Sequence, residues 1–229
     1  MKKQLRIISF FFFITGIAVI AYPFYTDYKV EKAQAKMEED WDALARTPIF
    51  QQKYESTAHN EQASAPSDTG PGTAVNAKKQ NSTESVMERK QIKQHNVVGK
   101  ISIPKIGLNA MIVPGINQKS LKNAVGWMPS TTLPDEQGNM VLAGHRSHTY
   151  GKFFNRLGEL TKEDVITIRS LSGTYTYKVY QIEVVKPTDV SVIQPTGGKT
   201  LTLVTCHPLN SNKYRLIIKA VQEDHQSSR

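Results

Sequence analysis

Two β-strands joined by a short polar loop are predicted by the stretch Leu201-Thr-Leu-Val-Thr-Cys206-His-Pro-Leu-Asn-Ser-Asn-Lys-Tyr-Arg215-Leu-Ile-Ile-Lys-Ala220. Residues 201–205 are apolar or β-branched, the types that suit a half-buried pleated surface. Residues 208–212 include proline, asparagine and serine, which favour a turn, and so short a connection makes the two strands antiparallel neighbours. The only cysteine of the chain ends the first strand, and an arginine opens the second.

Cys206 and Arg215 would form a chemically active pair if they stood opposite each other. Directly opposed side chains leave the same face of a sheet within about 5 Å at Cβ. A guanidinium keeps its charge, favours a neighbouring thiolate and can stabilise an oxyanion. A one-residue slip would separate the two side chains, and the sequence does not fix the register. A purely structural interpretation stays open, with Cys206 as a small buried hydrophobe and Arg215 as an ordinary strand charge.

A second stretch with catalytic residue types is Gly138-Asn-Met-Val-Leu-Ala-Gly-His145-Arg146-Ser-His148. It predicts a strand that ends in glycine and presents His145 at its tip. Histidine titrates near neutrality and can serve a cysteine nucleophile as base or acid. His148 is a weaker candidate, because loop histidines are usually solvated. His207 is expected to face away from Cys206, since neighbouring strand residues point to opposite faces.

Composition restricts the classes of partner and cofactor. The net charge of +9 raises nucleic acid as a partner, but the cations are scattered and no basic helix or aromatic-basic motif is present. An anionic membrane or wall polymer explains the charge equally well. A single cysteine excludes an internal disulfide, and no Cys/His cluster has metal-ligand spacing. We therefore expect no nucleic acid, no cofactor and no metal.

The N-terminal residues 1–28 are predicted to anchor the chain in a membrane. Lys2, Lys3 and Arg6 precede an apolar run over 7–25, and nineteen helical residues span about 28 Å, close to a bilayer core. The cations in front predict a cytoplasmic N-terminus, a single pass and a catalytic domain on the extracellular face. A cleaved signal peptide is the alternative. The small-residue cleavage site of such a peptide would lie at 19–21. The bulky Tyr22-Pro23 directly after that site argues against cleavage.

Residues 29–55 and 56–95 are expected to separate the membrane from a folded head. The first segment places apolar residues on one helical face and charges on the other. Such a stalk could lie on the membrane, pack on the head or pair with a second copy into a homodimer. The second segment is rich in polar residues, glycine and proline, which predicts a flexible linker with a reach of roughly 35 Å. The head would then be held away from the lipid.

The head, residues 96–229, has the pattern of an all-β domain. Strands are predicted over 97–103, 110–113, 140–143, 165–170, 175–185, 201–205 and 215–221, with short helical pieces over 121–125 and 153–160. Several short strands with few helices are typical of a small barrel or sandwich. We expect a barrel.

Taken together, these segments resemble a sortase, one of the membrane-anchored transpeptidases of Gram-positive bacteria. The resemblance covers about 97–220 and depends on three motifs, which are Ile101-Ser-Ile-Pro-Lys-Ile106, Asn139-Met-Val-Leu-Ala-Gly-His-Arg146 followed by Phe153, Phe154, Leu157 and Leu160, and Leu201-Thr-Leu-Val-Thr-Cys206 with Arg215. It implies a closed eight-stranded β-barrel with short helices behind a transmembrane helix. By similarity, Cys206 is the nucleophile, His145 the general acid/base, and Arg215 steadies the oxyanion and the substrate.

The resemblance also implies a substrate and a reaction. Sortases cleave an LPxTG-like sorting signal after its threonine, hold the acyl fragment as a thioester, and transfer it to an amine of a peptidoglycan precursor or of a pilin lysine. The implied partners are surface proteins that bear an LPxT-type signal. Thr205 matches the family pattern and is expected to contact substrate. The loop over 186–198 corresponds to the one that shapes the signal pocket, and its expected apolar lining is Val190, Val192, Ile193 and Pro195.

Some positions depart from the commonest family pattern. Gly126-Trp127 stands where many sortases carry Gly-His. The Cys206-His207-Pro208 sequence and its short loop are similar to the class D group, whose signals often end in LPxTA. Glu159, Glu163 and Asp164 fall near the calcium cluster of some class A members, but the cluster is not obvious and we expect no metal requirement.

Two other functions compete with transpeptidation. A cysteine peptidase or wall amidase would give the thioester to water, but such enzymes place the cysteine before the histidine and often on a helix. A non-enzymatic wall-binding β-domain would explain anchor, linker and charge. It would leave the coincidence of cysteine, histidine and arginine without a reason.

Overall fold

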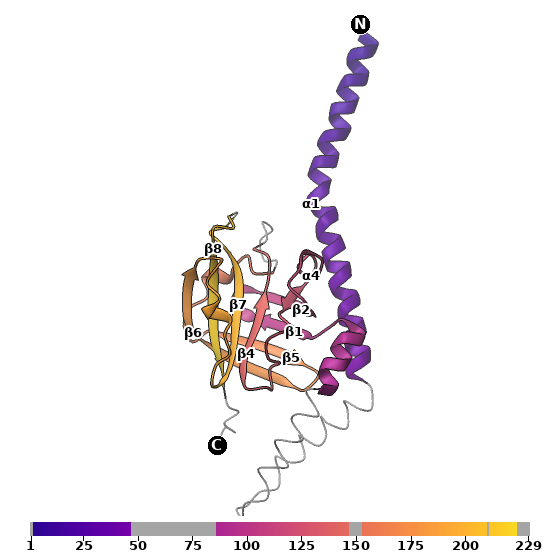
Figure 1. Ribbon diagram of the computed structural model, residues 1–229. Helices are drawn as coiled ribbons and strands as arrows, with labels where there is room; N and C mark the ends of the chain where they lie inside the picture. Colours follow the sequence, from indigo (N-terminus) through magenta and orange to yellow (C-terminus); the bar gives the residue numbers. More distant parts are fainter. Residues whose placement is uncertain (1, 47–85, 147–152, 210, 224–229) are drawn as a thin grey trace, which may run out of the picture.

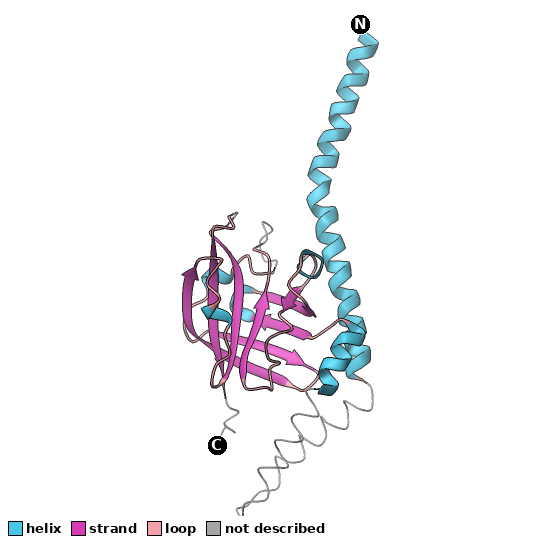
Figure 2. Cartoon of the chain, in the orientation of Figure 1, coloured by secondary structure: helices cyan, strands magenta, loops and turns pink. Residues whose placement is uncertain are grey.

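Eight strands close into a barrel in the computed structural model, which describes residues 2–46, 86–146, 153–209 and 211–223 (Figures 1 and 2). Around the barrel the order is β1-β2-β3-β4-β7-β8-β6-β5. The bounds are β1 Gly99–Ile103, β2 Leu108–Pro114, β3 Val125–Trp127, β4 Gly138–Ala143, β5 Val165–Ser170, β6 Thr174–Val185, β7 Lys199–His207 and β8 Tyr214–Gln222. The expected all-β closed barrel of eight strands is confirmed.

Short helices occupy several of the connections between strands. They are α4 Gln118–Leu121 and the 3-10 turns η1 Pro104–Ile106, η2 Leu157–Glu159 and η3 Ser191–Ile193. Strand β3 was not predicted, and Val125, which opens it, was assigned to a helical piece over 121–125. The strand has three residues, too few to show a period of two. Pairing with β2 on one side and β4 on the other defines it.

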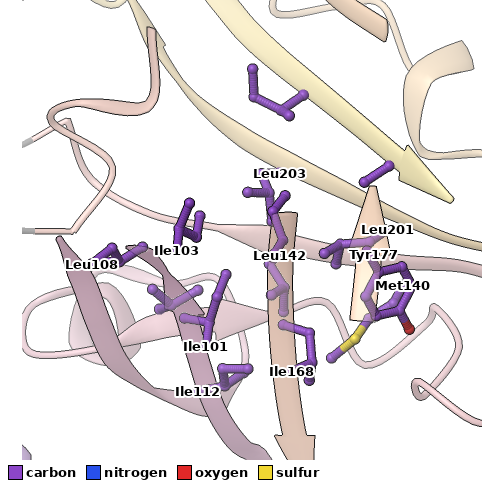
Figure 3. Close-up of a cluster of buried hydrophobic side chains, with 14 of the residues drawn as sticks. Ile101, Ile103, Leu108, Ile112, Met140, Leu142, Ile168, Tyr177, Leu201 and Leu203 are labelled. Atoms are coloured by element: carbon purple, nitrogen blue, oxygen red, sulfur yellow. The ribbon is translucent and has the colours of Figure 1, made fainter. Parts of the chain in front are cut away.

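The barrel interior holds one large cluster of apolar side chains (Figure 3). Leu142 of β4, Ile168 of β5 and Leu203 of β7 are among its fully buried members. Tyr177 of β6 is also buried, and its hydroxyl donates to the Pro134 carbonyl at 3.3 Å. Burial raises the pKa of this phenol far above its usual range. Side chains from strands far apart in the sequence therefore meet in a single interior.

Helix α1, Lys2–Ala45, joins the predicted anchor and the predicted stalk into one element (Figure 1). Within the described chain, one helix is long and apolar enough to cross a membrane, and the apolar window of that helix has no buried residue. Pro23 lies inside α1, and the helix continues past it. The hydrophobic run is thus presented to its surroundings and is not used in the barrel core.

The C-terminal part of α1 packs on the barrel wall. Trp41 and Leu44 are 3% and 6% exposed and form a second buried cluster with Val97, Met111 and Leu171. Of the three arrangements left open for the stalk, packing on the head is the one observed. In this arrangement the buried residues of that face, Trp41 and Leu44, are used within the chain, and a homodimer stays a prediction.

Residues 86–95 form a further helix at the edge of the barrel, although the polar composition placed them in the flexible linker. Ile92 joins the main core cluster. Arg89 binds Glu136 at 2.6 Å and lies 5.3 Å from the Trp127 ring centroid. The contacts of Ile92 and Arg89 therefore hold this segment on the barrel, although its polar composition predicted a flexible linker. The rest of the expected linker, 56–85, and the end of the expected stalk from 47 lie outside the described residues.

Truncating the core should cost far more stability than an equal truncation on the outside. Leu142→Ala removes a fully buried side chain, so we expect a loss of about 2–5 kcal/mol in the free energy of unfolding. Val184→Ala, on the outer face of β6 and 48% exposed, is the control, with an expected change within about 0.5 kcal/mol. Urea unfolding followed by tryptophan fluorescence measures both. Equal losses would contradict this assignment of the interior.

Candidate active site

The ends of two parallel neighbouring strands bring the predicted histidine and cysteine together. Strand β4 pairs with β7 in the register Ala143↔Val204, and the Gly144 amide extends the ladder by donating to the Val204 carbonyl at 3.1 Å. Continuing this register brings His145 level with Cys206. His145 is exposed, and Cys206 is half-buried and free of any disulfide. Residues 61 positions apart in the chain are therefore placed at the same end of the barrel, on neighbouring strands.

The register that the sequence left undecided is the one that pairs Cys206 with Arg215. Strands β7 and β8 are antiparallel with Cys206 directly opposite Arg215. Directly opposed residues project their side chains on the same face of a sheet. The cysteine strand consequently runs between the strand that ends at the histidine and the strand that begins near the arginine.

The Arg215 side chain is held by the loop that precedes it. Its Nη1 donates to the carbonyls of Asn212 and Tyr214, both at 2.9 Å. Both bonds come from one nitrogen, and a guanidinium carries further donors on Nη2 and Nε. The charge is thus fixed beside the end of β7 while donor capacity for a ligand remains.

Thr205 is buried and makes a hydrogen bond within the barrel. It is 2% exposed, and its hydroxyl donates to the Gly144 carbonyl at 2.8 Å. This bond ties the residue before Cys206 to the residue before His145. Contact between Thr205 and substrate stays a prediction, while the hydroxyl is used here to hold the two strand ends together.

Arg146 is a site residue that the sequence reasoning quoted in a motif but gave no role. Its Nη1 lies 3.0 Å from His207 Nδ1 and donates to the Cys206 carbonyl at 3.4 Å. Its Nε donates to the Asn155 carbonyl at 3.4 Å. One guanidinium thereby joins the end of β4, the end of β7 and the segment after 153. An arginine directly after a strand-end histidine was the available signal.

The connection between β6 and β7 places its apolar residues in different environments. Val192 is 5% exposed, Ile193 is half-buried, and Val190 and Pro195 are exposed, Val190 to 60%. Val192 therefore packs inward on the barrel, although the sequence placed it in the expected lining of the signal pocket. Val190 and Pro195 remain accessible to a substrate.

A buried amide fastens this connection to the barrel. Asn139 is 3% exposed, and its Nδ2 donates to the carbonyls of Val192 and Gln194 at 3.3 and 3.1 Å. Its Oδ1 accepts from the Thr202 hydroxyl at 2.8 Å. The Asn139 amide thus donates to the β6–β7 connection and accepts from β7. The connection is therefore held by β4 and β7.

The carboxylates near the possible calcium position are paired with cations. Glu159 binds Arg156 at 2.6 Å, Asp164 binds Lys105 at 2.8 Å, and Lys178 lies 3.6 Å from Glu163. The hydrogen bond from Arg156 lowers the pKa of Glu159. Burial works to raise the pKa of Asp164, but the bonds from Lys105 and Thr161 outweigh it and lower that pKa. Within the described ranges no three His, Cys, Asp or Glu residues gather in a way that could hold a metal.

Calcium should not stabilise the fold, because these carboxylates already have cationic partners. We expect the thermal unfolding midpoint to be the same with millimolar CaCl₂ and with EDTA. Lys105→Met, which frees Asp164, is the comparison variant, and it should lower the midpoint under both conditions. A midpoint that rises with calcium in the unaltered protein would contradict the prediction.

Comparison with known proteins shows the family to which this barrel is similar. A family model described as the sortase domain matches residues 101–223. Sortase A of Bacillus anthracis is 26% identical over 95% of both chains. Sortase D of Bacillus subtilis is 33% identical over 57% of this chain and 65% of its own. A Clostridium perfringens sortase D5 transpeptidase is 30% identical with a TM-score of 0.54, covering 60% of this chain and 88% of that one.

The matched region begins within β1 and ends just after β8, so it contains the barrel and both strand ends that carry the site. Sortase C1 of Streptococcus agalactiae has a TM-score of 0.53 at 34% identity, over 57% of this chain and 69% of that chain. The chain belongs to the sortase family of transpeptidases.

Proposed function

We propose that the protein cleaves an LPxTG- or LPxTA-like sorting signal after its threonine and transfers the acyl fragment to an amine of a peptidoglycan precursor. Cys206 is the nucleophile, His145 the general acid/base, and Arg215 the group that binds the oxyanion. The product is a surface protein joined to the cell wall. The observation that carries this proposal is the continuous β4-β7-β8 register, which lines up His145, Cys206 and Arg215.

The first half of the reaction forms a thioester. The Cys206 thiolate attacks the carbonyl carbon of the signal threonine, and Arg215 donates hydrogen bonds to the oxygen as it becomes negative. The C–N bond then breaks. His145 gives its proton to the departing amine, so the acyl group remains on Cys206.

The second half transfers the acyl group. The acceptor amine attacks the thioester carbonyl and gives its proton to His145. The C–S bond breaks and the thiolate of Cys206 is restored. Exposure of His145 and partial exposure of Cys206 support this step, because a second substrate must reach both groups.

Signal recognition is assigned to the connection between β6 and β7, where Val190 and Pro195 are exposed. The Cys206-His207-Pro208 sequence and the similarity to a Bacillus subtilis sortase D support a class D signal. Helix α1 is the single-pass anchor. The cations before its apolar run support a cytoplasmic N-terminus and an extracellular barrel.

Product analysis tests the reaction directly. The full chain in detergent is mixed with LPNTA or LPNTG peptide and a choice of amines, and mass spectrometry follows the products beside a Cys206→Ala control. We expect an acyl adduct on Cys206 and an amine-dependent ligated peptide, with LPNTA preferred. Hydrolysis that no amine alters would indicate a peptidase. A folded protein without any adduct would contradict both enzymatic interpretations.

Replacing the two assisting residues should leave the fold intact and slow the reaction. We expect His145→Ala to lower kcat/KM by about 10²–10⁴-fold, because proton transfer to the leaving amine is lost. Arg215→Ala should lower it by about 10²–10³-fold through loss of an oxyanion donor. The matched controls are His95→Ala and Arg169→Ala, both at exposed positions outside the site. Activity within twofold of the unaltered enzyme in either site variant would contradict the assigned role.

A further inference from the structure

Helix α1 contains the apolar run and is also packed on the barrel wall. We propose that α1 holds the barrel directly on the membrane surface with its catalytic end toward the lipid, so that the site acts on molecules held at that surface. The inference extends the proposed function, since it takes α1 as the anchor. It commits to a lipid bilayer as the partner of the catalytic end.

Contacts along α1 fix its position on the barrel. The Gln34 side chain accepts from the Met111 amide at 2.8 Å and donates to the Asn123 carbonyl. Glu38 binds Lys100. One turn further on, Trp41 and Leu44 are buried. A glutamine amide that bonds two backbone groups, together with a buried tryptophan, leaves the helix little freedom to slide or rotate.

The spacing along the helix leaves little room between lipid and barrel. The apolar run ends at Tyr25, and Gln34, nine residues later, is hydrogen-bonded to the barrel. Nine helical residues span about 13 Å. The segment 47–85 cannot lengthen this gap, because the elements on both sides of it are attached to the barrel: α1 through Trp41, and the helix over 86–95 through Ile92.

Strand directions decide which end of the barrel faces the membrane. Leu44, at the far end of α1 from the anchor, shares a cluster with Leu171 in the turn between β5 and β6. Strand β6 runs away from that turn, from Thr174 to Val185, and Val185 pairs with Arg215. Arg215 and Cys206 therefore lie at the end of the barrel nearer the anchor. Figure 1 shows the β7–β8 connection on the side toward which α1 continues to its N-terminus.

The side chains at this end suit an anionic lipid surface. Leu209 in the β7–β8 connection is 46% exposed, and Ile116 before α4 is 40% exposed. Exposed lysines accompany them, and these are Lys119, Lys122, Lys186 and Lys213. The exposed carboxylate of Glu31 lies on α1 between the apolar run and Gln34. Exposed apolar side chains among an excess of cations are what a membrane surface with anionic headgroups attracts.

Depth of the site can be measured with the protein's own single cysteine. The full chain is labelled on Cys206 with a thiol-reactive fluorophore and inserted into vesicles. Lipids that carry a quencher on the headgroup lower the fluorescence when the probe lies near the membrane surface. The matched probe is on Gly197→Cys in a Cys206→Ser background. Gly197 lies at the opposite end, before β7, and a Cβ there would meet no atom within 4 Å. We expect quenching at Cys206 to be several-fold stronger than at position 197.

Two insertions distinguish the helix from the linker as the spacer. Three Glu-Ala-Ala-Ala-Lys repeats between Tyr28 and Lys29 lengthen α1 by about 22 Å and should abolish quenching at Cys206. The same repeats between Gly70 and Pro71 should leave quenching unchanged. Equal quenching at both probes, or loss of quenching from the linker insertion, would overturn the inference.

The proposed chemistry is tested separately on the unlabelled proteins. Ligation of soluble peptide in detergent should be the same for the unaltered chain and both insertions, because no site residue changes. Absence of ligation in all three would contradict the proposed reaction and leave the depth measurement valid. A chain that fails to sediment with vesicles would contradict the anchor and with it the orientation.

Discussion

Backbone pairing of β7 with both β4 and β8 is the constraint on which the rest of the site depends. Strand pairing places residues at fixed positions with a period of two, so a slip of one residue would turn Cys206 away from Arg215. The hydroxyl of Thr205 and the guanidinium of Arg146 strengthen this pairing where the strands end. Thr205 binds the carbonyl of Gly144, next to His145, and Arg146 binds the carbonyl of Cys206 itself. The buried core supplies the stability, and these polar contacts define the geometry.

The docked helix adds a second constraint, between the barrel and its surroundings. Barrel enzymes usually place their chemistry on loops at one end, and a tether of flexible chain would leave that end free to turn. Here Gln34 and Trp41 connect the helix to the barrel wall, close to the point where the apolar run ends. The orientation of the site is thereby coupled to that of the anchor. A long connecting segment of chain is present, but it joins two elements of the same body.

Much of this could be predicted from the sequence, because its strongest signals are local. Short runs of apolar and β-branched residues predicted seven strands, and the apolar run over 7–25 predicted the anchor helix. Three features could not be predicted. The Cys206–Arg215 register depends on pairing across the sheet. Strand β3 is too short to have a period. The helix over 86–95 has polar neighbours and owes its place to Ile92 and Arg89. Arg146 follows a strand-end histidine, which marked its position but not its partners, and Asn139 acts through tertiary contacts that its place in the chain does not indicate.

The most direct test of the central claim is a crystal structure with a signal peptide mimic linked to Cys206 through a disulfide. We expect the Arg215 guanidinium to reach the carbonyl oxygen that stands for the signal threonine, with its Nη2 or Nε as donor. His145 should lie on the opposite side of the sulfur, within reach of the leaving position. A structure in which Arg215 bonds only the carbonyls of Asn212 and Tyr214, with the peptide carbonyl turned away from it, would contradict the account.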